Sequence, residues 1–264
     1  MKSVFALLLI LLSFQLLAQE SDSLLFRKTI RHGLTDSKAL LTAPARWSTG
    51  KWLLAGGTVA ATSLLIARGD EAIYHSTGNI SSSTIDRLFW LAEPAGNYYP
   101  LLAMGALMTH GLISKNNYST ETAVIMAEAL LISTVVVHAV KSTAGRQRPN
   151  ALGTTDPHDW KGPFFNGTSF FSGHTITAFT AASVVAYRYR DRIWVPVTAY
   201  SLATLGGLQR IVHQRHWASD VLMGAAVGTT IGIFISKQWD NNSIRFFPTV
   251  SPQHTGLSMS ISIK

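Results

Sequence analysis

Six apolar segments, each long enough for a helix, limit the folds that this sequence can adopt. None of them alternates apolar and polar residues with a period of two, so strands are not expected there. All are rich in Ala, Gly and Thr, and small residues of this kind allow neighbouring helices to approach closely. The sequence therefore predicts an all-α fold, an antiparallel bundle of about six helices. The segments cover residues 52–67, 99–114, 122–140, 175–187, 193–208 and 221–236.

The lengths of these segments leave two environments open. A helix that spans a bilayer prefers about 20 apolar residues, and the segments are at or below that length. Glu128 and His110 interrupt two of them. The segment 52–67 favours insertion, because Lys51 and Arg68 flank it. We therefore expect a membrane-embedded bundle, with the buried helices of a water-soluble bundle as the alternative.

The first residues have the features of a secretory signal peptide. Lys2 gives a positive start, residues 4–17 are apolar, and Ala18 supplies a small residue before a cleavage point. An uncleaved anchor helix is the alternative. The end of the chain alternates weakly, which is compatible with a short strand or with disorder. We divide the chain into a signal peptide (1–18), a polar N-terminal segment (19–51), a helical domain (52–237) and a C-terminal tail (238–264).

The charge balance favours anionic partners. The 264 residues include 22 Lys and Arg against 14 Asp and Glu, a formal net charge of +8. Phosphate, acidic lipid headgroups and nucleic acid all fit this excess. The sequence has no basic low-complexity tail and no arginine-rich arm, so no nucleic-acid partner is expected. It also has no cysteine, which excludes disulfides, thiolate metal sites and cysteine nucleophiles.

A first basic cluster, KSTAGRQRPN, closes the segment 122–140. Lys141, Arg146 and Arg148 bring three cations to one helix end, and Pro149 prevents the helix from continuing. Taken alone, the cluster indicates cations that complement a helix dipole, or an anchor beside a membrane.

A second cluster, FFSGHTITAF, opens the segment 175–187. Ser172 can cap this helix, and the free N–H groups of its first turn form a natural anion site. Gly173 lets an anion approach the backbone, and His174 stands beside it. Taken alone, the cluster is a capped helix with an incidental histidine.

A third cluster, LQRIVHQRHWASD, joins the last two segments. Arg210 ends one helix, and His216 and Asp220 share a face if the next helix begins near residue 217. Asp220 can then fix the imidazole tautomer and make the other ring nitrogen more nucleophilic. An aspartate that only caps the helix is the alternative. His213 lies three residues before His216, but the histidine–glutamate pattern of zinc sites is missing, so no metal is predicted.

Together the three clusters indicate one site. Their helix ends alternate in direction, so in an antiparallel bundle they meet on one side. The ordered pattern K-x6-R-P, S-G-H, R-x5-H-x3-D resembles that of the type 2 phosphatidic acid phosphatases, which share a fold with class A acid phosphatases and vanadium haloperoxidases. The resemblance covers about residues 122–236, a four-helix core in the C-terminal half. Two positions depart from the family: Phe171 replaces a usual proline and Gln209 a usual serine.

The resemblance implies a metal-independent phosphatase without a cofactor. His216 would attack phosphorus and form a phosphohistidine, Asp220 would support it, and His174 would protonate the leaving group. The residues that would bind the phosphoryl oxygens are Lys141, Arg148, Ser172, Gly173 and Arg210. The expected substrate is a phosphorylated lipid or a small phosphomonoester. A vanadate-dependent haloperoxidase, a soluble periplasmic acid phosphatase and a non-catalytic membrane protein are the alternatives.

Two signals bear on orientation, and they disagree. The turn RYRDR carries Arg188, Arg190 and Arg192, which argues that its side is cytoplasmic and that the three clusters face the periplasm. A cleaved signal peptide argues the reverse. We expect a protein of the cell envelope, either a multi-pass inner-membrane protein or a membrane-associated periplasmic one, with its site open to the periplasm.

Overall fold

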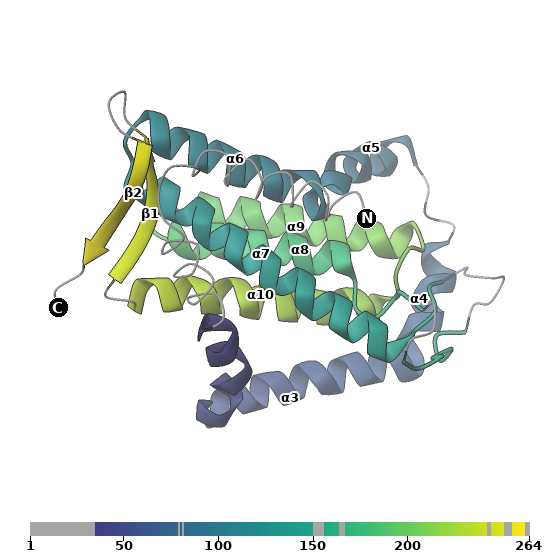
Figure 1. Ribbon diagram of the computed structural model, residues 1–264. Coiled ribbons are helices and arrows are strands. Elements are labelled where there is room, and N and C mark those ends of the chain that lie inside the picture. Colours follow the sequence, from purple (N-terminus) through teal and green to yellow (C-terminus); the bar gives the residue numbers. More distant parts are fainter. Residues whose placement is uncertain are drawn as a thin grey trace.

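A computed structural model describes residues 35–78, 80, 82–149, 156–163, 167–241, 244–250 and 255–261 (Figure 1). The predicted signal peptide lies outside the described residues, as do the start of the polar segment and parts of the loop between the first two clusters.

The described chain is a bundle of helices, and the predicted all-α class is confirmed. Each of the six predicted segments falls on a helix. The structure adds a helix over 35–42, the short α4 and α5, and three single turns, η1 (Ala43–Arg46), η2 (Leu65–Gly69) and η3 (Glu93–Gly96). The helices are α3 (Thr49–Leu64), α4 (Asp70–Thr77), α5 (Ser83–Ala92), α6 (Tyr98–Ile113), α7 (Asn117–Ala144), α8 (Gly173–Arg188), α9 (Trp194–Val212) and α10 (Ala218–Asn241).

The two unpredicted helices α4 and α5 lack a long apolar run. They have 8 and 10 residues, and each mixes polar with apolar side chains. Ser82 caps α5 by accepting a hydrogen bond of 3.2 Å from the N–H of Ile85. A pattern that relies on long apolar segments cannot detect such elements.

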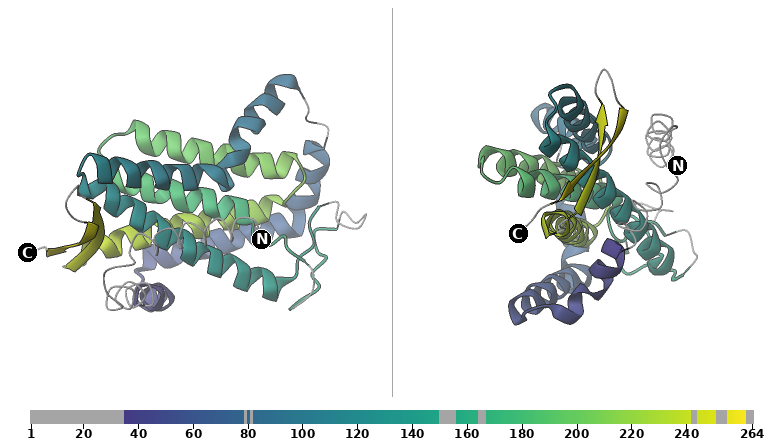
Figure 2. Two further views of the ribbon diagram at one scale, coloured as in Figure 1. Left: turned by 45° about the horizontal axis from the view of Figure 1, so that its top comes forward. Right: turned by 60° about the vertical axis from the view of Figure 1, so that its left-hand side comes forward.

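Close packing of α8 against α10 forms the centre of the bundle (Figures 1 and 2). Gly224, Gly228 and Gly232 lie four residues apart and turn one face of α10 toward the backbone of α8. A Cβ at Gly228 would stand 2.5 Å from the carbonyl oxygen of Ile176, so only glycine fits. The small residues noted in the sequence therefore bring these two helices together.

Three runs of helix are long and apolar enough to cross a membrane. They are Thr49–Thr77, Asn117–Ala144 and Ala218–Asn241. The first run contains α3, which lies outside the four-helix core (Figure 2) and exposes apolar side chains such as Leu53, at 71% of its surface. An apolar surface of this kind suits lipid rather than water. The chain is therefore a membrane protein.

The end of the chain forms a hairpin. Strands β1 (Ile244–Val250) and β2 (Thr255–Ile261) pair antiparallel, with Ile244 opposite Ile261. The weak alternation in the sequence corresponds to these strands, and α10 continues to Asn241 before them.

Candidate active site

The three clusters meet at one end of the bundle, where α4 and α5 also lie (Figure 1). The chain leaves α7 through Gly145, which has a left-handed φ of 62°. A Cβ at this position would stand 2.2 Å from the carbonyl oxygen of Gly162, so the turn requires glycine. The following residues then run back across the start of α10.

His216 and Asp220 lie beside each other and are buried. The distance from Nδ1 of His216 to Oδ2 of Asp220 is 3.6 Å. The same Oδ2 accepts hydrogen bonds from the N–H of Trp217, at 3.1 Å, and from the hydroxyl of Ser169. Asp220 therefore faces the histidine and caps α10 at once, so the two alternatives drawn from the sequence coexist.

Burial determines the charge of His216. It lowers the pKa of His216 from 6.5 to about 4, because Asp220 only partly offsets the loss of solvation, and Arg148 and Lys141 lower the pKa further. The ring is therefore neutral at neutral pH. With Nδ1 facing a carboxylate, the Nε2 lone pair is the one left for a nucleophile.

His174 is also held neutral while no anion is bound. Burial first, and then the charge of Arg210, lowers its pKa to about 4. Its Nε2 is buried and has no hydrogen-bond partner in the described part of the chain. The turn η3 packs directly against the ring, since a Cβ at Gly96 would stand 2.4 Å from its Cδ2.

Two of the predicted phosphate-binding cations have no anionic partner among the described residues. Neither Lys141 nor Arg148 forms an ion pair with the residues that the structure describes, and Nε of Arg148 is buried without a hydrogen bond. Lys141 reaches the start of α8, because a Cβ at Gly173 would stand 3.5 Å from its Nζ. Unpaired buried donors require an explanation, and an anion that they bind would supply one.

Arg210, by contrast, has partners. Its Nη2 lies 3.2 Å from Oε1 of Glu93, and its Nε donates to Oε1 of Gln209 at 2.6 Å. Nε2 of Gln209 lies 2.8 Å from Nδ1 of His213. The departure from the family pattern at position 209 therefore supplies a side chain that orients Arg210, and His213 supports it.

Ser172 caps α8, as its position in the sequence indicates. Its Oγ accepts from the N–H of Thr175 at 3.3 Å and from the hydroxyl of Thr175 at 2.9 Å. Its own N–H donates to the carbonyl of Asp220 at 3.0 Å, which joins the start of α8 to the start of α10. Among the described residues, no group of three His, Cys, Asp or Glu side chains is arranged to hold a metal ion.

Three residues of the site lie outside the sequence motifs, namely Asp70, Glu93 and Ser169, and the motifs do not reveal the role of Arg146. Arg146 was grouped with the helix-end cations, yet its side chain is fully buried and pairs with Asp70 and Asp220. Asp70 is 150 residues from Asp220, and no motif links the two. The N–H of Ser169 donates to the carbonyl of Arg146 at 3.0 Å, which brings its hydroxyl to the pair formed by His216 and Asp220.

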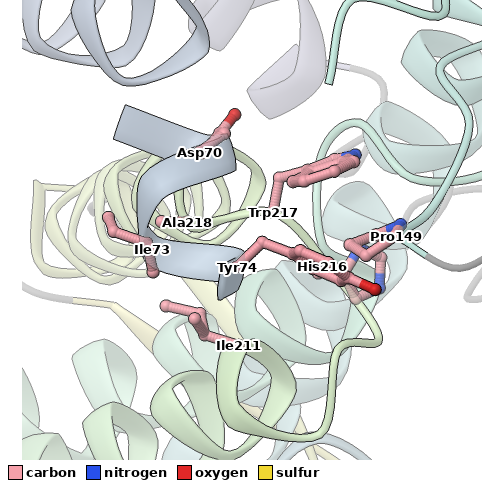
Figure 3. A pocket seen from close by; sticks show the side chains of 8 residues that line it. All are labelled: Asp70, Ile73, Tyr74, Pro149, Ile211, His216, Trp217 and Ala218. Atoms are coloured by element: carbon pink, nitrogen blue, oxygen red, sulfur yellow. The ribbon is translucent and has the colours of Figure 1, made fainter. Parts of the chain in front are cut away.

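A small cleft opens beside His216 (Figure 3). It is a narrow indentation: the roughly 170 Å³ between its walls includes open solvent, and no enclosed part of it is wide enough for a water molecule. Ile73 and Tyr74 of α4, Ile211 of α9 and Pro149 form much of its wall, so the surface next to the histidine is largely apolar. Here α4 contributes to the site although it is distant in sequence.

Comparisons with known proteins match the C-terminal half. Residues 122–244 match the family model described as the PAP2 superfamily. The lipid A 1-phosphatase of Porphyromonas gingivalis is 36% identical over 134 residues, which are 50% of this chain and 27% of that protein. The chain thus spans about a quarter of the length of this curated relative.

Two solved structures resemble the chain. LpxE of Aquifex aeolicus gives a TM-score of 0.47 at 24% identity, over 63% of this chain and 93% of that one. The first transmembrane PAP2 type phosphatidylglycerolphosphate phosphatase from Bacillus subtilis gives a TM-score of 0.47 at 16% identity, over 69% and 92%. The segment matched by the family contains every predicted site residue, whereas Asp70 and Glu93 lie before it.

Proposed function

We propose that this chain, whose residues 122–244 match the model of the PAP2 superfamily, is a metal-independent membrane phosphatase of that superfamily. It hydrolyses a phosphate monoester or pyrophosphate carried by a lipid, through a phosphohistidine intermediate. The observation that carries the proposal is a pair of buried side-chain nitrogens, Nε of Arg148 and Nε2 of His174, that have no hydrogen-bond partner among the described residues, together with a neutral His216.

In the proposed reaction the cations hold the phosphoryl group. Lys141, Arg148 and Arg210 neutralise its oxygens, and the first N–H groups of α8 complete the contacts. Arg210 exchanges Glu93 for the phosphate as the substrate enters. Three side-chain cations then supply the charge stabilisation that a metal ion provides in other phosphoryl-transfer enzymes.

The chemistry then takes place at two histidines. Nε2 of His216 attacks phosphorus in line, a P–N bond forms, and the bond from phosphorus to the leaving oxygen breaks. His174 gives a proton to that oxygen, because the phosphate dianion that binds beside it raises its pKa above the value of about 4 set by burial. Water then attacks the phosphohistidine, His174 takes up a proton from it, and phosphate leaves with neutral His216 restored.

A lipid substrate is supported by the surroundings of the site. The catalytic residues sit at the end of a bundle whose helices are apolar enough to span a membrane. The surface beside His216 carries Ile73, Ile211 and Pro149, and apolar side chains at this place suit the part of a lipid next to its phosphate. The relative from Porphyromonas gingivalis is named a lipid A 1-phosphatase, and a lipid A phosphate is one candidate among phosphorylated lipids.

We also propose that the site faces the periplasm. Of the three arginines in the turn after α8, Arg188 is buried between Glu121 and Asp240 and so does not count toward membrane orientation. Arg190 and Arg192 are exposed and still favour a cytoplasmic position for that turn. The site lies at the other end of the bundle.

Phosphate release by the purified full chain tests the proposed function. Lipid phosphates and soluble phosphomonoesters are compared in detergent micelles, with and without a metal chelator. Release from a lipid phosphate that survives the chelator is expected, and rapid quenching with labelled substrate traps the label on His216. Loss of activity in the chelator, restored by zinc or magnesium, contradicts the proposal. Oxidation of bromide by hydrogen peroxide on the vanadate-loaded protein, without phosphate release, would favour a haloperoxidase.

A further inference from the structure

A buried chain of charges runs behind the pair formed by His216 and Asp220. Nη2 of Arg146 lies 2.7 Å from Oδ2 of Asp70, and Nη1 of Arg146 lies 2.7 Å from Oδ1 of Asp220. The side chains of Asp70, Arg146 and Asp220 have no solvent exposure. Two carboxylates thus share one guanidinium directly behind the candidate nucleophile.

The protein itself uses all five N–H donors of Arg146. Besides the two carboxylates, Nη1 donates to the hydroxyl of Ser219 at 2.7 Å, and Nε and Nη2 donate to the carbonyl of Pro157 at 3.0 and 2.8 Å. The guanidinium also lies 5.0 Å from the ring centre of Trp160 and 5.5 Å from that of Trp217. A guanidinium has five such donors, so none remains for a substrate. Arg146 therefore differs from Arg148, whose Nε has no partner among the described residues.

Asp70 holds the same turn of α10 from the other side. Its Oδ1 accepts the N–H of Ser219 at 2.9 Å, and its Oδ2 accepts the hydroxyl of Ser219 at 2.5 Å. Ser219 precedes Asp220 in the chain. The carboxylate of Asp70 therefore fixes both the guanidinium that pairs with Asp220 and the backbone next to Asp220. Asp70 comes from the start of α4, at the end of the apolar run that begins with α3 and before the segment matched by the PAP2 superfamily.

We propose that Asp70 is a positioning residue for the reaction, and that it acts through Arg146 on Asp220. Arg146 takes Oδ1 of Asp220, which leaves Oδ2 directed at Nδ1 of His216. Asp70 fixes the place of Arg146 and offsets part of its charge, so that Arg146 does not draw Asp220 away from the histidine. The N-terminal run α3–α4 is thus a functional part of the site. The inference rests on the proposed function, because it assigns Asp220 the support of a nucleophilic histidine.

Exchange of Asp70 for asparagine tests this role in the full chain. Asp70→Asn keeps the size of the side chain and removes its charge. We expect kcat to fall roughly 10- to 100-fold, as a small misplacement of a catalytic group does, with KM changed less than about 2-fold. Glu71→Gln is the matched control, since Glu71 is the neighbour on α4 and is 64% exposed. It should leave both constants unchanged.

A double variant separates positioning from a general loss of stability. If Asp70 acts through Asp220, adding Asp70→Asn to Asp220→Asn causes no further loss of kcat in single-turnover assays. A merely structural role gives losses that multiply, and that result overturns the proposal. An unchanged kcat in Asp70→Asn overturns it as well.

A readout without turnover keeps this inference apart from the proposed function. In protein with ¹⁵N-labelled histidine, the signal of His216 is assigned by its absence in His216→Ala. The Nδ1–H tautomer should dominate in the wild type and in Glu71→Gln, and it should mix with the Nε2–H tautomer in Asp70→Asn. If the wild type releases no phosphate, the proposed function fails while this measurement still decides the role of Asp70. An unaltered tautomer in Asp70→Asn contradicts that role.

Discussion

Glu93 and Arg210 form an ion pair between η3 and α9, with Oε1 and Nη2 3.2 Å apart. The carboxylate of Glu93 thus occupies N–H donors of Arg210 that the proposed reaction needs for the phosphoryl group. Arg210 is buried, while the side chain of Glu93 is 55% exposed, so solvent can replace Arg210 as the partner of this carboxylate. Glu93 is therefore a competitor that a phosphate must displace.

Glu93→Gln should consequently strengthen anion binding. Loss of an ion pair with one exposed partner corresponds to a roughly 2- to 5-fold lower inhibition constant for phosphate or vanadate. Inhibition of phosphate release, measured at fixed pH and ionic strength, gives this constant. Asp86→Asn on the exposed face of α5 is the control. Weaker inhibition in Glu93→Gln would instead make Glu93 part of the binding site.

The nucleophile and its supporting carboxylate should respond differently to substitution. His216→Ala removes the atom that forms the covalent bond, so kcat should fall by at least about 1,000-fold. Asp220→Asn should also lower kcat strongly, while binding of vanadate is largely kept because the cations remain. Vanadate binding is measured on the inactive variants by titration. Wild-type turnover in His216→Ala would refute the assignment.

Much of this site could be predicted because its chemistry is concentrated in three short motifs. Each motif sits at the end of a long apolar helix, and antiparallel packing brings such ends together. His174, His216 and Asp220 therefore meet at the same end of the bundle, because successive helices run in opposite directions. The same reasoning identified the cap at Ser172, which depends only on residues nearby in sequence.

Asp70 and Glu93 could not be found in this way. They lie on α4 and η3, elements too short to leave a periodic apolar pattern, and their partners are 76 and 117 residues away. A lone aspartate or glutamate in a polar stretch is most often a solvated surface residue. The run α3–α4 and the turn η3 pack against the end of the bundle. This packing places Asp70 beside the buried Arg146 and Glu93 beside the buried Arg210. The burial of Arg188 against Glu121 and Asp240 is hidden from the sequence for the same reason, since both partners are distant along the chain.

The two site histidines predict a loss of stability in acid. In the folded protein His174 and His216 have pKa values of about 4, whereas 6.5 is usual for histidine in an unfolded chain. Below pH 6.5 the unfolded chain therefore binds more protons than the folded one. Above about pH 6.5 neither histidine lowers the free energy of unfolding. As the pH falls to about 4, each lowers that free energy by up to about 3 kcal/mol.

His174→Asn isolates this effect, because asparagine does not titrate. Melting temperatures of the detergent-solubilised protein, followed by tryptophan fluorescence, should fall less between pH 6.5 and pH 4 in this variant than in the wild type. The control is His75→Asn, since that side chain is 64% exposed. Equal pH dependence of His174→Asn and wild type would show that folding does not lower the pKa of His174.

The sequence has no cysteine, and this allows a direct test of which side of the membrane the site faces. Lys161 is exposed beside the site, where its N–H donates to the carbonyl of Gly145 at 3.0 Å. Asp191 is exposed in the turn between α8 and α9, at the opposite end of the bundle. The proposed orientation puts these two ends in opposite compartments, so Lys161→Cys should react with a membrane-impermeant thiol reagent in intact spheroplasts. Asp191→Cys should react only after lysis, and the reverse pattern would put the site in the cytoplasm.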